Sequence, residues 1–454
     1  MPRTILVPWL IFLAAPASAQ VMPLADSVHA LNQAGLWNRA SQLAQVSYDK
    51  STSRDEQCVL LIYWADALVH TGRLETAGRQ VEAFDRQCSA TASAVRYAAT
   101  VGGLRSQTNL NPLPVTGLDF SSVDQFWRIA DILTKDVEPT DAEWRSLFSS
   151  VGYRLAMRRL STTRSDLEIA LRPSHRAVLD SLTTLNHDDS SKVRHLARAV
   201  TLRAALARYR DSVAGTPLVQ QAIALASRFL PPHATDGIAP PLVAFAIFAP
   251  DAYSVGGAVV IDLDHVYDTG GLTELLAHEF FHAYVARLPK GLFPAADDPS
   301  FDLVRALANA RNEGIADLID KPYPLSVRPG SELETYAKRY NEAYARTPQV
   351  IHDIDSALVV AAEDSTKLRD VGRRVQQLLP AGGHFNGAYM AREIYETFGV
   401  DSLYPGESDL FAFWRAYAEA EAKRGNPSPY SPKAVGLLDA LERNYVALSV
   451  VPRF

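Results

Sequence analysis

A short apolar segment that contains two histidines and a glutamate constrains the fold of this chain more than any other part of the sequence. Residues 272–284 read LTELLAHEFFHAY, and their apolar positions recur with the period of a buried helix. On such a helix, His278 and His282 lie about 40° apart around the axis and about 6 Å apart along it. Both imidazoles can therefore reach one metal ion, and this spacing favours zinc.

Glu279 lies between the two histidines and points about 100° around the helix axis from His278. At that edge of the histidine face it is poorly placed to bind the same ion, but it can accept a proton from a water molecule held there. A structural zinc normally has four protein ligands and needs no such base. The segment therefore predicts a catalytic zinc, with Glu279 as general base.

A second predicted helix offers the carboxylate that a catalytic zinc requires. Residues 305–320, RALANARNEGIADLID, have an apolar stripe and carry Glu313 and Asp317 one helical turn apart. We predict that Glu313 is the third ligand and that the fourth position is left for water, whose pKa the ion lowers toward about 7. We predict that Asp317 accepts the free N–H of a ligating imidazole and so fixes its tautomer.

The segment His278–His282, followed by NEGIAD at residues 312–317, resembles the gluzincin zinc peptidases. In their thermolysin-like members, a glutamate ligand is followed four residues later by an aspartate. NEGIAD, the preceding strands and a later GxYMA string are most similar to secreted zinc-dependent peptidases known only as a domain of unknown function. The resemblance covers about residues 242–400 and implies hydrolysis of peptide bonds in a zincin-like α+β unit with one zinc ion.

The resemblance also implies two features of substrate handling. An edge strand just before the zinc helix pairs with an extended peptide, and AVVIDL at residues 258–263 fits that role. A histidine or tyrosine from a downstream segment stabilises the negative charge that develops on the attacked carbonyl. The segment AGGHFNGAYMAREI at residues 381–394 offers His384 and Tyr389, and both remain candidates.

The first residues have the features of a secretory signal peptide. A positive residue, Arg3, precedes an apolar run that ends in small residues at Ala17 and Ala19. The run is shorter than the roughly 20 residues needed to cross a bilayer. We therefore expect cleavage after Ala19, export to the periplasm or the medium, and no membrane span in the mature chain.

The chain has 454 residues, too many for one ordinary globular core. Two segments, Leu242–Phe248 and Ala258–Leu263, have strand character, and most of the remaining sequence is helical in pattern. We predict a mostly α protein with a small β-sheet. The expected parts are a signal peptide at 1–19, a helical-hairpin region at 20–105, a linker at 106–118, a helical region at 119–235 and a zincin-like catalytic domain at 236–454.

The region after the signal peptide contains a weak repeat with a period of 37 residues, in which ALNQAGLWNRASQLA matches ALVHTGRLETAGRQV. The pattern looks like a pair of tetratricopeptide-type helical hairpins, which could bind a protein partner, and an unspecialised helical layer is the alternative. Cys58 and Cys88 are the only cysteines, and in an exported chain we expect them to form a disulfide. A catalytic thiol is the alternative, but neither has a neighbouring histidine in the sequence.

Composition excludes some classes of function and leaves others open. Apolar residues make up 47% of the chain and charged residues 21%, as in folded globular proteins. The net charge of -6 provides no basic field for a polyanion, so nucleic acid is not an expected partner. Two alternatives to a peptidase remain: a partner-binding helical scaffold with a structural or vestigial zinc site, and a zinc hydrolase of a non-peptide amide or ester.

Overall fold

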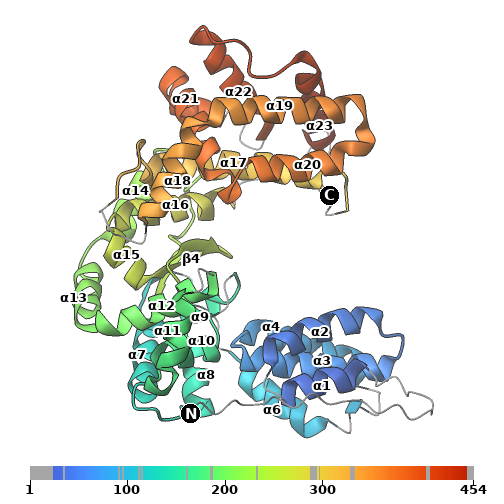
Figure 1. Ribbon diagram of the computed structural model, residues 1–454, viewed down its shortest axis with the longest axis vertical. Coiled ribbons are helices and arrows are strands. Elements are labelled where there is room, and N and C mark those ends of the chain that lie inside the picture. Colours follow the sequence, from blue (N-terminus) through green and yellow to red (C-terminus); the bar gives the residue numbers. More distant parts are fainter. Residues whose placement is uncertain are drawn as a thin grey trace, which may run out of the picture. The chain divides into compact units, whose positions relative to one another are not determined.

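The computed structural model describes residues 24–446 except 34–35, 90–92, 95–96, 111–112, 114–115, 160–161, 185–187, 232–233, 287–293, 296, 328–332 and 405–409. The predicted signal peptide at 1–19 lies outside the described residues. The chain divides into two compact units, Met1–Leu110 and Asn111–Phe454, which Figure 1 shows by colour along the sequence. Both are built mainly from helices, and the second holds one small sheet, so the predicted mostly α fold is confirmed.

The described part of the first unit is helical. Its helices are α1 (Leu24–Gln33), α2 (Trp37–Lys50), α3 (Arg54–His70), α4 (Leu74–Cys88) and α6 (Ala98–Thr108). Consecutive helices from α1 to α4 pack on one another around small apolar side chains such as Ala40, Ala44 and Ala67. Cys58 in α3 and Cys88 at the end of α4 form a disulfide, with Cα atoms 5.8 Å apart. The bridge therefore joins the start of one helix to the end of the next.

The second unit begins with helices that precede most of the sheet in the sequence. They are α7 (Ser121–Leu133), α8 (Asp141–Ser149), α9 (Val151–Ala156), α10 (Arg164–Leu171), α11 (Arg176–Thr184), α12 (Asp188–Thr201), α13 (Arg203–Ala214) and α14 (Leu218–Ala226). The helices that follow the sheet are α15 (Leu263–Thr269), α16 (Leu272–Val285), α17 (Phe301–Asp320), α18 (Glu334–Ala345), α19 (Thr347–Glu363), α20 (Leu368–Leu378), α21 (His384–Phe398), α22 (Leu410–Lys423) and α23 (Pro432–Val446). Among the described residues, no helix is both long and apolar enough to cross a bilayer.

The sheet has the strand order β1-β2-β4-β3. Its strands are β1 (Gly117–Asp119), β2 (Leu242–Ala246), β3 (Ala252–Val255) and β4 (Ala258–Asp262). β1, β2 and β4 are parallel, whereas β3 runs antiparallel to β4. The two predicted strands correspond to β2 and β4. The short strands β1 and β3 were not anticipated.

The expectation that AVVIDL is the edge strand is wrong. This segment forms β4, which pairs with β2 on one side and β3 on the other. All five residues of β4 are buried, and a continuous apolar run is typical of a strand covered on both faces. The edge strand beside the zinc helix is β3, which is short and only half buried.

Asp262, at the end of β4, holds this part of the sheet in place. Its Oδ2 accepts a hydrogen bond from the backbone N–H of Phe248 at 2.7 Å. Its Oδ1 accepts one from the N–H of His265 at 2.8 Å, which caps α15, and lies 2.9 Å from Nε2 of His195 on α12. One buried carboxylate thereby ties the end of β4 to the segment after β2 and to two helices.

Glycines allow α17 and α21 to cross at very short range. A Cβ atom on Gly387 would lie 1.9 Å from the carbonyl oxygen of Ala310. Gly383 has a φ of +91°, and a Cβ atom there would lie 2.7 Å from Cα of Ala310. Since real contacts of that length do not occur, side chains at these positions would push the helices apart. The crossing brings the start of α21, and therefore His384, against α17.

Candidate active site

The two helices that the sequence predicts to carry the metal ligands, α16 and α17, pack against each other. His278 and His282 project from α16, and Glu313 projects from α17. The Nε2 atoms of the two imidazoles are 3.1 Å apart. Oε2 of Glu313 lies 3.0 Å from Nε2 of His282 and 3.7 Å from Nε2 of His278. The structure therefore brings all three predicted ligands together.

The donor atoms suit a zinc ion. Two imidazole nitrogens and one carboxylate oxygen are the donor types of a catalytic zinc site. These three atoms all lie within 4.8 Å of one another. Burial alone would raise the pKa of Glu313, but the imidazoles of His282 and His278 hold it well below its usual range. The carboxylate is therefore ionised, as a metal ligand must be.

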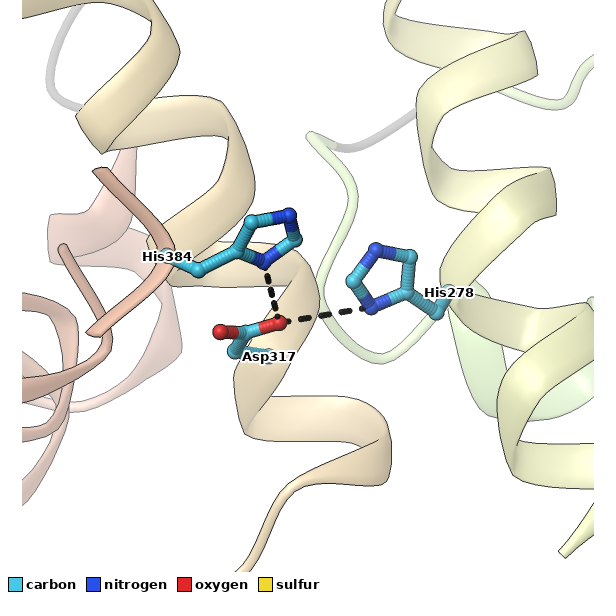
Figure 2. A group of neighbouring side chains, drawn as sticks. All are labelled: His278, Asp317 and His384. Atoms are coloured by element: carbon cyan, nitrogen blue, oxygen red, sulfur yellow. Dashed lines mark hydrogen bonds and ion pairs between the residues drawn. The ribbon is translucent and has the colours of Figure 1, made fainter. Parts of the chain in front are cut away.

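A second group, formed by His278, Asp317 and His384, also has metal-ligand spacing. It uses the other ring nitrogen of His278, and Figure 2 shows Oδ1 of Asp317 directed toward Nδ1 of both imidazoles. That oxygen already contacts a cation, because Nζ of Lys321 lies 2.7 Å from it. The lysine ammonium already balances the charge of this carboxylate, so the group of His278, His282 and Glu313 is the better candidate for a zinc site.

Of the two aspartates on α17, Asp320 and not Asp317 lies closer to Nδ1 of His278, the ring nitrogen that faces away from the other predicted ligands. Oδ1 of Asp320 lies 2.9 Å from Nδ1 of His278, whereas Oδ1 of Asp317 lies 3.7 Å from the same atom. Asp317 is instead 2.9 Å from Nδ1 of His384. The two aspartates therefore orient different imidazoles. The sequence did contain a signal for Asp320, because it lies two helical turns after Glu313 on the same face of α17.

The site opens into a cleft of about 1210 Å³. Its lining includes residues of β3 and the segment before it, the end of α17, and Tyr336 of α18. His278, Glu279, His282, Glu313 and His384 all line this cleft. The predicted general base therefore shares one solvent-accessible space with the predicted metal ligands.

A comparison with known protein families gives one match. The profile of the family described as "Putative zinc dependent peptidase (DUF5700)" matches residues 144–425. The chain belongs to this family. The match includes every candidate ligand and extends upstream of residue 236 through α8 to α14. Neither the curated proteins nor the solved structures contain a significant match to the chain.

Burial and neighbouring charges shift the pKa values of the groups in this candidate site. Burial raises the pKa of Glu279, which makes its carboxylate a better proton acceptor. Burial disfavours a charge on His278, but the charge and hydrogen bond of Asp320, together with the hydrogen bond to Glu313, outweigh that effect and raise the pKa of His278 to about 10. Burial also disfavours a charge on His384, and Asp317 raises the pKa of that imidazole above its ordinary value. A positive charge is therefore favoured between these carboxylates, and a bound zinc ion would supply it in place of the proton on His278.

The two candidates for stabilising the attacked carbonyl lie in different places. His384 lines the cleft, and its Nε2 is 3.2 Å from Oε2 of Glu313. Tyr389 packs with Tyr344 and Tyr417, at ring distances of 5.2 and 6.3 Å. Figure 2 shows the rings of His384 and His278 both directed toward the carboxylate of Asp317. The geometry favours His384 over Tyr389.

Two further residues that line the candidate site were not predicted from the sequence. Tyr336 on α18 lines the cleft together with Glu313 and His384, and burial raises the pKa of its phenol. Lys321 follows α17 directly and lines the same cleft. Tyr336 comes from another helix, and no spacing in the sequence links it to the metal ligands. For Lys321 there was a signal: it directly follows a helix face that carries Glu313, Asp317 and Asp320.

Proposed function

We propose that this chain is an exported zinc-dependent peptidase that hydrolyses peptide bonds with Glu279 as general base. The observation that supports this most is the approach of Glu313 Oε2 to within 3.0 and 3.7 Å of the two histidine Nε2 atoms. The cleft that holds them also contains the buried carboxylate of Glu279. Three protein ligands with a base beside them are typical of a hydrolytic zinc site.

In this proposal, His278, His282 and Glu313 hold the zinc. When bound, zinc makes a water molecule more acidic and polarises the substrate carbonyl. Glu279 accepts the proton of that water and then donates it to the leaving amine. The raised pKa of Glu279 suits both steps, because the carboxyl must take up a proton and release it again near neutral pH.

His384 is proposed to stabilise the negative charge on the attacked carbonyl oxygen. Asp317 accepts the Nδ1–H of His384, and its charge favours the protonated ring, in which both nitrogens are donors. Nε2–H then faces the cleft next to Glu313. A fixed donor at the site of developing charge is usually a large contributor to catalysis. Tyr336 lines the same cleft and is a second candidate for this role.

The edge strand β3 is proposed to bind the substrate backbone. Ala252, Tyr253 and Ser254 line the cleft, and within the described residues β4 is the only strand that pairs with β3. An extended peptide that adds to such an edge is recognised mainly through its main chain. Selectivity for particular side chains is then modest, which suits unfolded or flexible protein segments as substrates.

Export rests on the signal-like residues 1–19 and agrees with the disulfide between Cys58 and Cys88. Disulfides persist in oxidising compartments and are rare in the cytosol of most organisms. We therefore propose a periplasmic or extracellular location. A protein partner for the hairpins of the first unit also remains a proposal.

Glu279→Gln tests the proposed chemistry, because the amide keeps the shape of the side chain and cannot take up the proton. We expect the variant to keep its zinc and to hydrolyse casein about 10²- to 10⁴-fold more slowly. Glu342→Gln, at an exposed position on α18, is the matched control and should behave as the wild type. Equal hydrolysis by Glu279→Gln would remove Glu279 from the mechanism. A zinc-loaded wild type that cleaves only non-peptide amides or esters would instead support the alternative hydrolase.

A further inference from the structure

The side chain of Lys321 connects the two aspartates that orient His278 and His384. Its Nζ lies 2.7 Å from Oδ1 of Asp317 and 2.9 Å from Oδ2 of Asp320. Asp320 contacts Nδ1 of His278, and Asp317 contacts Nδ1 of His384, each at 2.9 Å. A continuous chain of polar contacts therefore runs from a predicted zinc ligand, through one ammonium group, to the proposed donor for the carbonyl oxygen.

These carboxylates need a compensating charge. The side chain of Asp317 is fully buried, and that of Asp320 is 9% exposed. Two buried carboxylates so close together repel each other, and each is costly to bury without a partner. Lys321, whose side chain is 15% exposed, supplies one positive charge that contacts both. Without it, at least one aspartate would gain by turning toward solvent and leaving its imidazole.

The backbone of Lys321 is held independently of its side chain. Its N–H donates to the carbonyl oxygen of Asp317 at 2.9 Å, which continues the hydrogen bonding of α17 by one residue. Its carbonyl oxygen accepts a hydrogen bond from Arg392 of α21 at 3.4 Å. A substitution that changes only the end of the side chain should therefore leave the path of the chain intact.

We infer that Lys321 is a positioning residue that fixes the orientations of His278 and His384 together, by holding Asp320 and Asp317 with one ammonium group. The inference rests on the proposed function, since it assumes that His278 binds zinc and that His384 acts on the substrate. In this proposal Lys321 acts through the two aspartates that its ammonium group contacts, and not on the ion or the reacting atoms directly. It couples the strength of metal binding to the placement of the donor for the carbonyl oxygen.

The test measures zinc affinity and kinetics on the full chain with Lys321→Met, which keeps the length of the side chain and removes its charge. Zinc affinity is measured by competition with a chromogenic chelator, so that this readout does not depend on turnover. We expect zinc affinity to fall about 10- to 100-fold, as is usual when a partner of a metal ligand is lost. At saturating zinc we expect kcat to fall and KM to stay close to that of the wild type, because the proposed substrate strand, β3, is unchanged.

Two further variants separate positioning from general stability. Lys338→Met makes the same change at an exposed position on α18 and should alter neither readout. Lys321→Arg keeps the charge and should recover part of the lost zinc affinity and kcat. If the methionine variant does not fold, Lys321→Gln keeps one N–H donor group without the charge, and the same outcomes apply to it.

A double-mutant cycle with Asp320→Asn tests the connection directly. If Lys321 acts through Asp320, its substitution should weaken zinc binding much less in the Asp320→Asn background than in the wild type. Additive losses, or zinc affinity and kcat unchanged by Lys321→Met, would overturn the inference while leaving the zinc peptidase intact. A wild type that binds no zinc would instead overturn the proposed function.

Discussion

Gly314 of α17 and Gly387 of α21 lie directly against each other. A Cβ atom on Gly314 would be 2.2 Å from the carbonyl carbon of Gly387. The crossing lies next to Glu313 in the sequence and three residues after His384. The separation between the predicted zinc ligand and the proposed carbonyl donor is therefore set by how closely two backbones approach.

Gly387→Ala should disturb this crossing. The added methyl group would meet the carbonyl oxygen of Ala310, so the helices must separate. Overpacking of this kind typically costs about 1 to 3 kcal/mol of unfolding free energy, and zinc affinity should fall with it. Gly436→Ala is the control, because it is exposed on α23 and its Cβ would meet nothing within 4 Å. We expect the control to stabilise the chain by about 0.5 to 1 kcal/mol in urea unfolding.

Asp320→Asn and Asp317→Asn should affect different steps. Loss of the Asp320 carboxylate removes the partner of His278, so we expect zinc affinity to fall about 10- to 100-fold. Loss of the Asp317 carboxylate removes the partner of His384, so we expect kcat to fall with a smaller change in zinc affinity. Chelator competition and casein hydrolysis at saturating zinc measure the two effects. The reverse pattern would show that the aspartates serve the other imidazole.

His384→Gln should slow turnover without releasing the metal. Loss of one donor to a developing oxyanion commonly lowers kcat about 10²- to 10³-fold. Because Nε2 of His384 is 3.2 Å from Oε2 of Glu313, zinc affinity must be measured as well. Loss of zinc from this variant would make His384 a ligand instead.

For the tyrosines, we expect Tyr336→Phe to lower kcat more than Tyr389→Phe, since only Tyr336 of these two lines the cleft in the described structure.

Cys58→Ser combined with Cys88→Ser should destabilise the first unit and spare the chemistry. Opening a loop with a sequence separation of 30 costs about 3 to 4 kcal/mol in the chain-entropy view. Both cysteines belong to the first unit, whereas the candidate site residues belong to the second. We expect an earlier unfolding transition for the first unit in a thermal melt, with kcat on a short peptide unchanged. A parallel loss of kcat would show that the site depends on the first unit.

The sequence was most informative where metal-binding residue types recur at the spacing of one helix face. His278, Glu279 and His282 follow from spacing on one helix, and Glu313 follows from an acid on a second apolar helix. The strands β2 and β4 were predictable because each is a buried apolar run. These features depend on local pattern, which a single sequence displays directly.

Other features depend on how segments meet in space. Which imidazole each aspartate contacts is decided by the crossing of α16, α17 and α21, so Asp317 and Asp320 could not be assigned from spacing alone. The edge strand β3 has four residues, of which two are half buried, and such a segment gives little periodic signal. Tyr389 was a candidate because the family resemblance implies a downstream histidine or tyrosine, but on α21 it packs against other tyrosines.

One helix, α17, carries Glu313, both aspartates and the glycine that contacts α21. The proposed metal ligand, the two aspartates beside it and the close contact with α21 therefore all belong to one helix. Unfolding of this helix would therefore end all of these roles at once, whereas a single side-chain substitution on it need not. On heating, the metal should depart at the same temperature at which the surrounding helices come apart.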